Sequence, residues 1–192
     1  QELLHSARMK WKRRESNNGF TIYQSELIEL FEKEITNLDT HEFDKVIKKI
    51  FEEYKDQVYT YTRDLIKKLK SVDYVLLAIS GSHQEIVDQV AKYYGFDDAI
   101  GTTYTRSKKM FSGKKFIASS DKKSNLEKLV QKHNLDFVGS YAIGDSHSDA
   151  AMLELVENPI AFNPDKELFE VAKSKNWNVV IERKNMIYEL EP

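Results

Sequence analysis

The chain has 192 residues, of which 31% are charged and 41% are hydrophobic, and it contains no cysteine. Its 29 basic and 31 acidic residues give a formal net charge of −2, which argues against nucleic acid or an acidic membrane surface as a partner. The lack of cysteine excludes a disulfide scaffold and thiolate metal sites, and it agrees with a reducing, cytoplasmic location. No apolar run approaches the ~18 residues of a membrane span, so we expect no membrane partner.

The first 57 residues predict a helical bundle. Residues 1–80 contain one glycine and no proline, the two residues that most often end helices. Apolar residues recur at helical spacing through residues 22–35. Asp39 followed by Glu42 is typical of a helix N-cap with its reciprocal partner.

The remaining residues, 58–192, predict an α/β fold. The run YVLLAIS (74–80) is continuously apolar, as in a strand that is covered on both faces. Strands that alternate with helices imply right-handed crossovers and a parallel sheet, here a Rossmann-like core of three layers. The expected elements are a helix over 58–69, a strand over 74–80, a helix stopped at Gly95, a hairpin turning at Ser112-Gly113, a helix over 123–133, a strand over 137–145, a helix over 150–156, a strand over 159–162, a helix over 165–175 and a strand over 178–182.

Polar residues follow the first predicted strand. In an open parallel sheet, ligands bind beyond the carboxyl ends of the strands. Ser80-Gly81-Ser82 offers a hydroxyl, a glycine that permits close backbone approach, and the amides of a helix N-terminus, which together can hold a phosphate. The structural alternative is that Ser82 only caps the helix.

The strand predicted over 137–145 is followed by a turn, and the two overlap in the motif GDSHSD (144–149). This motif places Asp145 and Asp149 four residues apart. Mg²⁺ takes one or two protein carboxylates together with waters and phosphate oxygens, so this pair suffices to bind it. The alternative is that Asp149 caps the next helix and Asp145 is a solvated turn residue. Lys122 and Lys123 begin the preceding helix, and one of them is suited to neutralise a phosphoryl group, although most such lysines are simply solvated.

In this order and spacing, the three motifs resemble those of the haloacid-dehalogenase-like (HAD) phosphatases, particularly the phosphoserine-phosphatase-like branch. The resemblance implies that Ser80 and Gly81 hold the substrate phosphate. Lys122, 23 residues before Asp145, matches the lysine of the third motif, which binds phosphate and acts in catalysis. Asp145 is then a catalytic Mg²⁺ ligand, and Asp149 is the supporting carboxylate of the metal site.

The same resemblance implies a domain organisation and an activity. Residues 1–57 look like the family's helical cap, residues 58–192 like its core, and the hairpin near 101–117 like a small flap. The implied activity is hydrolysis of a small phosphorylated metabolite through an aspartyl-phosphate, with Mg²⁺ as cofactor. The sequence leaves the choice of metabolite and the oligomeric state open.

One motif of the family is missing. Its DxDxT motif, which supplies the nucleophilic aspartate at the end of a central first strand, does not occur in the 192 residues. Because residues 1–14 already predict a cap helix, we expect a chain truncated upstream of Gln1, short of its first core strand and inactive alone.

Two other kinds of protein share parts of this pattern. One is a non-catalytic module that binds a phosphorylated ligand or partner. The other is a receiver-type signalling domain, in which the lysine follows the acidic pair. The order is opposite here, because Lys122 precedes Asp145, and the receiver is therefore disfavoured.

Overall fold

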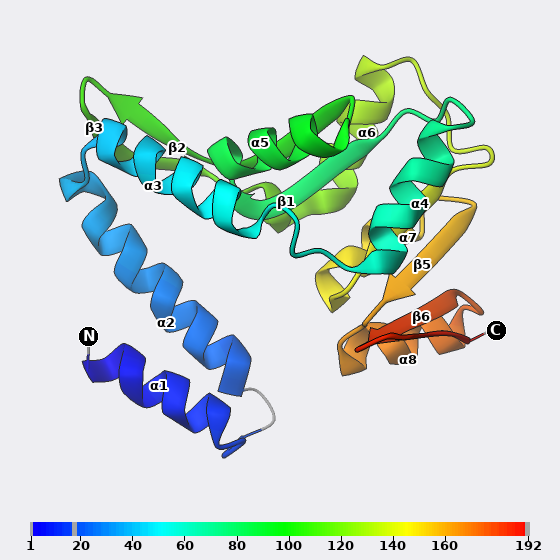
Figure 1. The fold of residues 1–192 in the computed structure, drawn as a ribbon, viewed down its shortest axis with the longest axis horizontal. Helices are drawn as coiled ribbons and strands as arrows, with labels where there is room; N and C mark the ends of the chain where they lie inside the picture. The colour runs from blue at the N-terminus through cyan, green and yellow to red at the C-terminus, as the bar shows by residue number, and fades with distance from the viewer. Residues whose placement is uncertain (1, 17–18, 191–192) are drawn as a thin grey trace. The chain divides into compact units, whose positions relative to one another are not determined.

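A computed structural model describes residues 2–16 and 19–190 of the chain (Figure 1). The chain divides into two compact units, unit 1 with residues 1–46 and 104–115, and unit 2 with residues 47–103 and 116–192. The first boundary lies eleven residues earlier than the one expected after residue 57. The central part of the 101–117 hairpin is grouped with the amino-terminal helices rather than with the core.

Unit 1 is mostly helical. It holds α1 (Glu2–Lys12), α2 (Gly19–Glu34), the 3-10 helix η1 (Ile35–Asn37), the first half of α3 (Thr40–Tyr54), the end of β2 (Asp98–Ser107) and most of β3 (Met110–Phe116). Trp11 of α1 stacks on Tyr23 of α2, with ring centroids 5.6 Å apart. Asp39 caps α3, since its Oδ1 accepts from the amides of His41 and Glu42, as the sequence predicts.

The β2–β3 hairpin turns at Lys108 and Lys109, so the predicted turn at Ser112-Gly113 is wrong. Lys108 adopts a left-handed conformation with φ 57°, and Gly113 lies inside β3 with φ 79°. A Ser-Gly dipeptide is a strong turn signal, whereas a lysine pair is not, so local sequence favoured the wrong position.

The hairpin is fastened to α3 within unit 1. The amide of Thr40 donates to the carbonyl of Lys109 at 2.8 Å. The guanidinium of Arg106 donates two hydrogen bonds, of 2.6 and 2.8 Å, to the carboxylate of Asp44. This pairing lowers the pKa of the Asp44 carboxyl. The flap-like hairpin and the helices of unit 1 are therefore linked by charge-assisted bonds.

Unit 2 contains the α/β part of the chain. Its further elements are α4 (Thr60–Lys70), β1 (Leu77–His83), α5 (Gln84–Tyr94), η2 (Ala118–Asp121), α6 (Lys122–Lys132), β4 (Tyr141–Gly144), η3 (His147–Asp149), α7 (Ala150–Leu153), β5 (Asn158–Phe162), α8 (Lys166–Ser174), β6 (Asn178–Arg183) and β7 (Met186–Leu190). Gly95 ends α5 in the left-handed conformation, with φ 74°, as predicted. None of the helices in the described ranges has the length and apolar character needed to cross a membrane.

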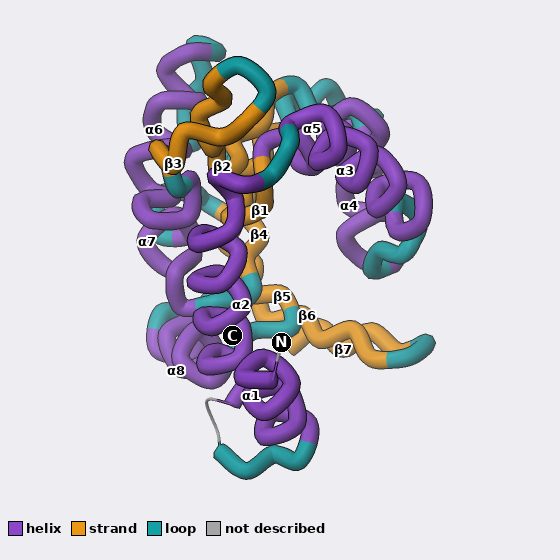
Figure 2. Tube along the Cα trace, turned by 90° about the vertical axis from the view of Figure 1, so that its left-hand side faces the viewer, coloured by secondary structure: helices purple, strands orange, loops and turns teal. Residues whose placement is uncertain are grey.

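The strands form two sheets, with orders β1-β2-β3 and β4-β5-β6-β7. The β1–β2, β4–β5 and β5–β6 pairs are parallel, which confirms the predicted α/β class with a parallel sheet. The antiparallel β7 was not predicted. Figure 2 shows β1 and β4 between α6 and α7 on one side and α4 and α5 on the other.

The best-covered part of unit 2 surrounds β5. Ala161 of β5 and Leu168 of α8 are fully buried in one cluster. Ile160 and Phe162 point to the opposite cluster, which is flanked by Tyr61 of α4. Helices therefore cover both faces of this sheet at β5.

Strands β1 and β4 are edge strands of their sheets in the described chain. Leu77, Ala78 and Ile79 of β1 are only half-buried, although the sequence predicts a strand covered on both faces. Ala142 and Ile143 of β4 are half-buried too. Apolar residues on two parallel edge strands are thus less covered than those of β5.

The entrances of β1 and β4 are held together. Tyr74, three residues before β1, donates from its hydroxyl to the carbonyl of Gly139 at 2.9 Å. Its ring also meets that of Tyr141, the first residue of β4, with centroids 5.9 Å apart. The two edge strands thus start close to one another without sharing a hydrogen-bond ladder among the described residues.

Asp98 links the start of β2 to the end of α6, and its contribution to the free energy of unfolding should depend on pH. Its Oδ2 lies 2.7 Å from both Lys132 Nζ and His133 Nε2. The hydrogen bond from Lys132 is the main cause that lowers the pKa of Asp98. A lowered carboxyl pKa stabilises the fold above the unfolded pKa of about 3.9, and the stabilisation is lost as the pH falls through the folded pKa.

We therefore expect Asp98→Asn to lower the free energy of unfolding by about 1 kcal/mol at pH 7. In urea titrations, the difference from the unmodified chain should shrink below about pH 4. A difference that stays constant down to pH 3 would contradict the ionic account.

Candidate phosphate and metal site

The turn after β4 is built around Gly144. A Cβ added at Gly144 would lie 2.5 Å from the Cβ of Asp149, which is closer than two non-bonded carbon atoms can approach. Glycine at this position therefore lets the chain fold Asp149 back beneath the end of the strand. The sequence signal GDSHSD marks this turn, but it does not show how closely Asp149 approaches the strand.

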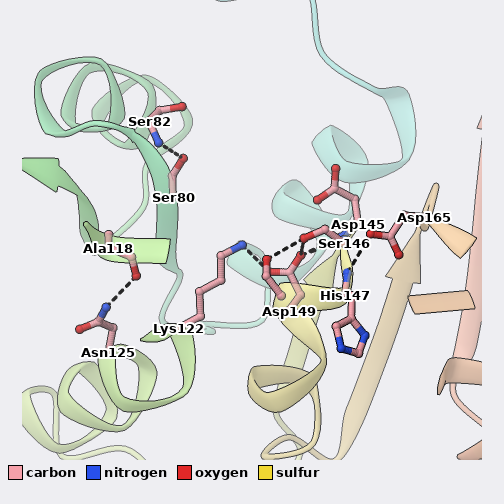
Figure 3. Close-up of polar contacts among 11 residues, drawn as sticks. Ser80, Ser82, Ala118, Lys122, Asn125, Asp145, Ser146, His147, Asp149 and Asp165 are labelled. Carbon is pink, nitrogen blue, oxygen red and sulfur yellow. Dashed lines mark hydrogen bonds and ion pairs between the residues drawn. The ribbon is translucent and has the colours of Figure 1, made fainter. Parts of the chain in front are cut away.

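Asp149 is the buried carboxylate of the site, with 2% of the residue exposed. Its Oδ2 accepts hydrogen bonds from the Asp145 amide, the Ser146 amide and the Ser146 hydroxyl, each at 3.1 Å. Its Oδ1 forms an ion pair with Lys122 Nζ (Figure 3). These four partners occupy its oxygens in shaping the turn, where Ser146 is the N-cap of η3 and Asp149 completes its capping box. Asp149 precedes α7 but makes no side-chain capping bond to it, so the alternative that Asp149 caps the next helix is wrong.

Lys122 is the first residue of α6, and its ammonium group points to Asp149. The Lys122 side chain is 14% exposed, whereas Lys123 is an exposed residue. Asp121 caps α6 by accepting from the Ser124 amide at 3.0 Å, and the buried Asn125 donates to the carbonyl of Ala118 at 2.8 Å. The start of α6 is thus fixed on both sides of Lys122.

Asp145 is the carboxylate of this turn that stays exposed, and within the described ranges no cationic side chain forms an ion pair with it. Partial desolvation, followed by the nearby negative charge of Asp149, raises the pKa of the Asp145 carboxyl, while Lys122 opposes this rise. A divalent cation would relieve this repulsion. The donor chemistry therefore fits Mg²⁺ through Asp145, with Asp149 in support.

The described residues contain no group of three or more His, Cys, Asp and Glu placed to hold a metal ion. A Mg²⁺ ion at Asp145 would thus depend on ligands other than a preformed cluster of these side chains, such as water and phosphate oxygens. Mg²⁺ commonly binds in this way, with one or two carboxylates and several waters.

Ser80 and Gly81 lie near the carboxyl end of β1. The Ser80 hydroxyl accepts from the amide of Ser82 at 3.1 Å, and the carbonyl of Gly81 accepts from the Thr102 hydroxyl at 2.9 Å. The strand continues to His83, which occupies the N-cap of α5. Ser82 is therefore not the cap that the structural alternative assigned to it.

Figure 3 shows how the predicted residues are arranged. Lys122 extends from α6 to Asp149, Ser80 lies on β1, and Asp145 lies at the turn after β4. The structure joins Lys122, Asp145 and Asp149 in one network, in which Asp149 contacts both of the others. Ser80 shares with them the carboxyl-end location but none of these hydrogen bonds.

Sequence reasoning missed Asp165, which follows β5 and caps α8. The amide of His147 donates to its Oδ2 at 2.9 Å, so Asp165 belongs to the same turn network. An Asp directly before a predicted helix is a readable N-cap signal. Its second contact joins residues 18 apart in sequence and has no local signature.

Comparisons with known proteins indicate the family of the chain. The family model for haloacid dehalogenase-like hydrolases matches residues 3–154. A phosphoserine phosphatase of Mycobacterium tuberculosis is 24% identical over 127 residues, which cover 65% of this chain and 41% of the relative. A histidinol-phosphatase of Neisseria meningitidis is 33% identical over 111 residues, covering 54% of this chain and 50% of the relative. The chain thus spans about half the length of these relatives.

Solved structures share the fold. A Bordetella pertussis protein of unknown function aligns with a TM-score of 0.71 and 17% identity, over 93% of this chain and 80% of that one. A phosphoserine phosphatase in a phospho-aspartyl intermediate analogue form aligns with a TM-score of 0.55 and 20% identity, over 83% and 81%. At these identities the likeness supports the fold alone.

Proposed function

Because the chain belongs to the haloacid dehalogenase-like hydrolase family, we propose that it forms a large part of a Mg²⁺-dependent phosphomonoesterase. The observation that carries this proposal is the Lys122–Asp149 ion pair, which lies beneath an exposed Asp145 at the carboxyl end of a parallel strand. Relatives named phosphoserine phosphatase and histidinol-phosphatase support a small phosphorylated metabolite as substrate.

Each residue has a distinct role in this proposal. Ser80 and the backbone at Gly81 hold phosphate oxygens, since glycine allows them to approach the main chain closely. Lys122 neutralises charge on the phosphoryl group. Asp145 binds Mg²⁺, which supplies further positive charge to the phosphate oxygens, and Asp149 orients Lys122 and the turn.

We propose that neither carboxylate of the turn is the nucleophile. Asp149 is occupied by Lys122 and the turn, and an Asp145 that binds the cation commits the lone pairs that attack on phosphorus requires. We propose that the nucleophilic aspartate ends a further β-strand, outside the 192 residues, that pairs with β1 and β4. Its carboxylate attacks phosphorus while the bond from phosphorus to the substrate oxygen breaks, and a second carboxylic acid on that strand gives its proton to the leaving oxygen. The same carboxylate then takes a proton from the water that hydrolyses the aspartyl-phosphate.

The two edge strands support this location. Both are parallel strands of their sheets, both have half-buried apolar residues, and both carry proposed site residues at their carboxyl ends. Tyr74 holds their entrances together through Gly139 and Tyr141. An inserted strand would satisfy the unpaired backbone groups of both edges.

A non-catalytic module that binds a phosphorylated ligand is the second candidate, favoured by the absence of DxDxT from the sequence. Both candidates predict phosphate binding by the 192-residue chain, measured by ³¹P NMR with Mg²⁺ present, and weaker binding in Ser80→Ala. Neither candidate predicts hydrolysis of an aryl phosphate by this chain alone. Rapid hydrolysis would overturn the proposed need for another strand, and no phosphate binding would contradict both candidates.

A further inference from the structure

Asp165 is placed differently from an ordinary helix cap. It lies half-buried between β5 and α8, and its Oδ1 accepts from the Leu168 amide at 2.7 Å, which is the capping bond. Its Oδ2 accepts from the His147 amide at 2.9 Å, and its own amide donates to the carbonyl of Asp145 at 2.8 Å. Two of these three bonds therefore reach the turn after a different strand.

We propose that Asp165 is a positioning residue that fixes the Asp145 turn for Mg²⁺ binding. This inference rests on the proposed function, because it assumes that Asp145 binds the cation. Asp165 itself is not required to touch the metal or the substrate. Its effect passes through the backbone on both sides of Ser146.

The turn is held from two directions. Asp149 accepts the amides of Asp145 and Ser146, while Asp165 binds the Asp145 carbonyl and the His147 amide. The carbonyl of Ser146 accepts from the Asp149 amide at 2.8 Å. The main chain around Asp145 is thus fixed by hydrogen bonds, which leaves its side chain as the part directed to a ligand.

Such fixation is what a metal site with few protein ligands requires. When one carboxylate carries most of the protein's contribution, each loss of orientation reduces affinity directly. The negative charge of Asp165 also acts on Asp145. Added negative charge near the ligand favours a divalent cation, so position and charge work in the same direction.

Asparagine separates the capping role from the positioning role. Asn is as good an N-cap as Asp, but it offers one acceptor oxygen and presents an amide NH2 group, a donor, where the second oxygen was. Asp165→Asn can therefore satisfy Leu168 or His147, but not both. Asp121 is a matched control in the same unit, because it caps α6 through its Oδ1, and Asn keeps the one acceptor oxygen that this bond needs and so leaves Lys122 in place.

The test measures Mg²⁺ affinity and thermal unfolding of the 192-residue chain and of the two variants, with ¹⁵N-labelled protein to follow the His147 amide. We expect Asp165→Asn to weaken Mg²⁺ binding about 10-fold to 100-fold and to shift the His147 amide resonance. Asp121→Asn should change Mg²⁺ affinity less than about 2-fold. The Tm of Asp165→Asn should stay within a few degrees of that of Asp121→Asn.

The outcomes separate this inference from the proposed function. If the unmodified chain binds Mg²⁺ and Asp165→Asn binds it equally well, the positioning role is overturned and the metal site stands. A fall in Tm with unchanged Mg²⁺ affinity would likewise leave Asp165 as a helix cap only. If the unmodified chain binds no Mg²⁺, the proposed metal site fails, and the inference fails with it.

Discussion

Replacing Asp145 by Asn is expected to weaken Mg²⁺ binding by more than about 100-fold, because it removes the exposed carboxylate of the turn. The stability of the fold should not decrease. Burial and Asp149 raise the pKa of Asp145, which means that the folded state disfavours its charged form. Removing that charge should therefore raise the free energy of unfolding slightly while it abolishes the metal site.

Isothermal titration with Mg²⁺ and urea unfolding measure these two effects on the same samples. Asp136→Asn is a suitable control, because Asp136 is an exposed loop carboxylate that accepts from the Val138 amide at 2.8 Å, outside the site network. In the unmodified chain, Mg²⁺ affinity should also fall as the pH drops through the raised pKa of Asp145, since protonation competes with the cation. Mg²⁺ affinity unchanged by Asp145→Asn would remove Asp145 from the metal site.

The Lys122–Asp149 ion pair gives the largest expected effect on stability. The Asp149 side chain is 3% exposed and that of Lys122 is 14% exposed, so their attraction acts where water screens little. Lys122→Met would leave the Asp149 carboxylate buried without its cation. The free energy of unfolding should fall by about 3 kcal/mol or more, which urea titration at pH 7 can measure.

Two further variants keep this prediction decisive even if Lys122→Met does not fold. The double variant Lys122→Met, Asp149→Asn removes both charges and keeps an acceptor oxygen for the turn, so it should recover most of the lost stability. Lys123→Met removes an exposed lysine one position along and should change stability by less than about 0.5 kcal/mol. A double variant no more stable than Lys122→Met alone would show that the pair's charge is not what holds the turn.

Much of unit 2 was predictable because the signals are local. Gly95 stops α5, and the apolar runs at 74–80 and 159–162 mark strands within a few residues of their positions. What local patterns could not indicate is pairing. β7 was missed, and the division into two sheets depends on which strand edges meet.

The site shows the same limit. GDSHSD predicts a turn with two carboxylates, but the sequence alone leaves both of them available to a cation. The close approach at Gly144 turns Asp149 toward Lys122, 27 residues earlier, and leaves Asp145 exposed. Asp165 joins the turn from the next strand, which no spacing within the motif could reveal.

We propose that the 192 residues hold a phosphomonoesterase site that a strand between β1 and β4 completes. Its most direct test is hydrolysis of p-nitrophenyl phosphate with Mg²⁺ by the chain extended at its amino end with an apolar strand that ends in Asp-x-Asp-x-Thr. A matched extension carries Asn at the first Asp. We expect Mg²⁺-dependent hydrolysis by the Asp form and at least about 100-fold less by the Asn form. Equal hydrolysis by both forms, or none by a folded Asp form, would contradict it.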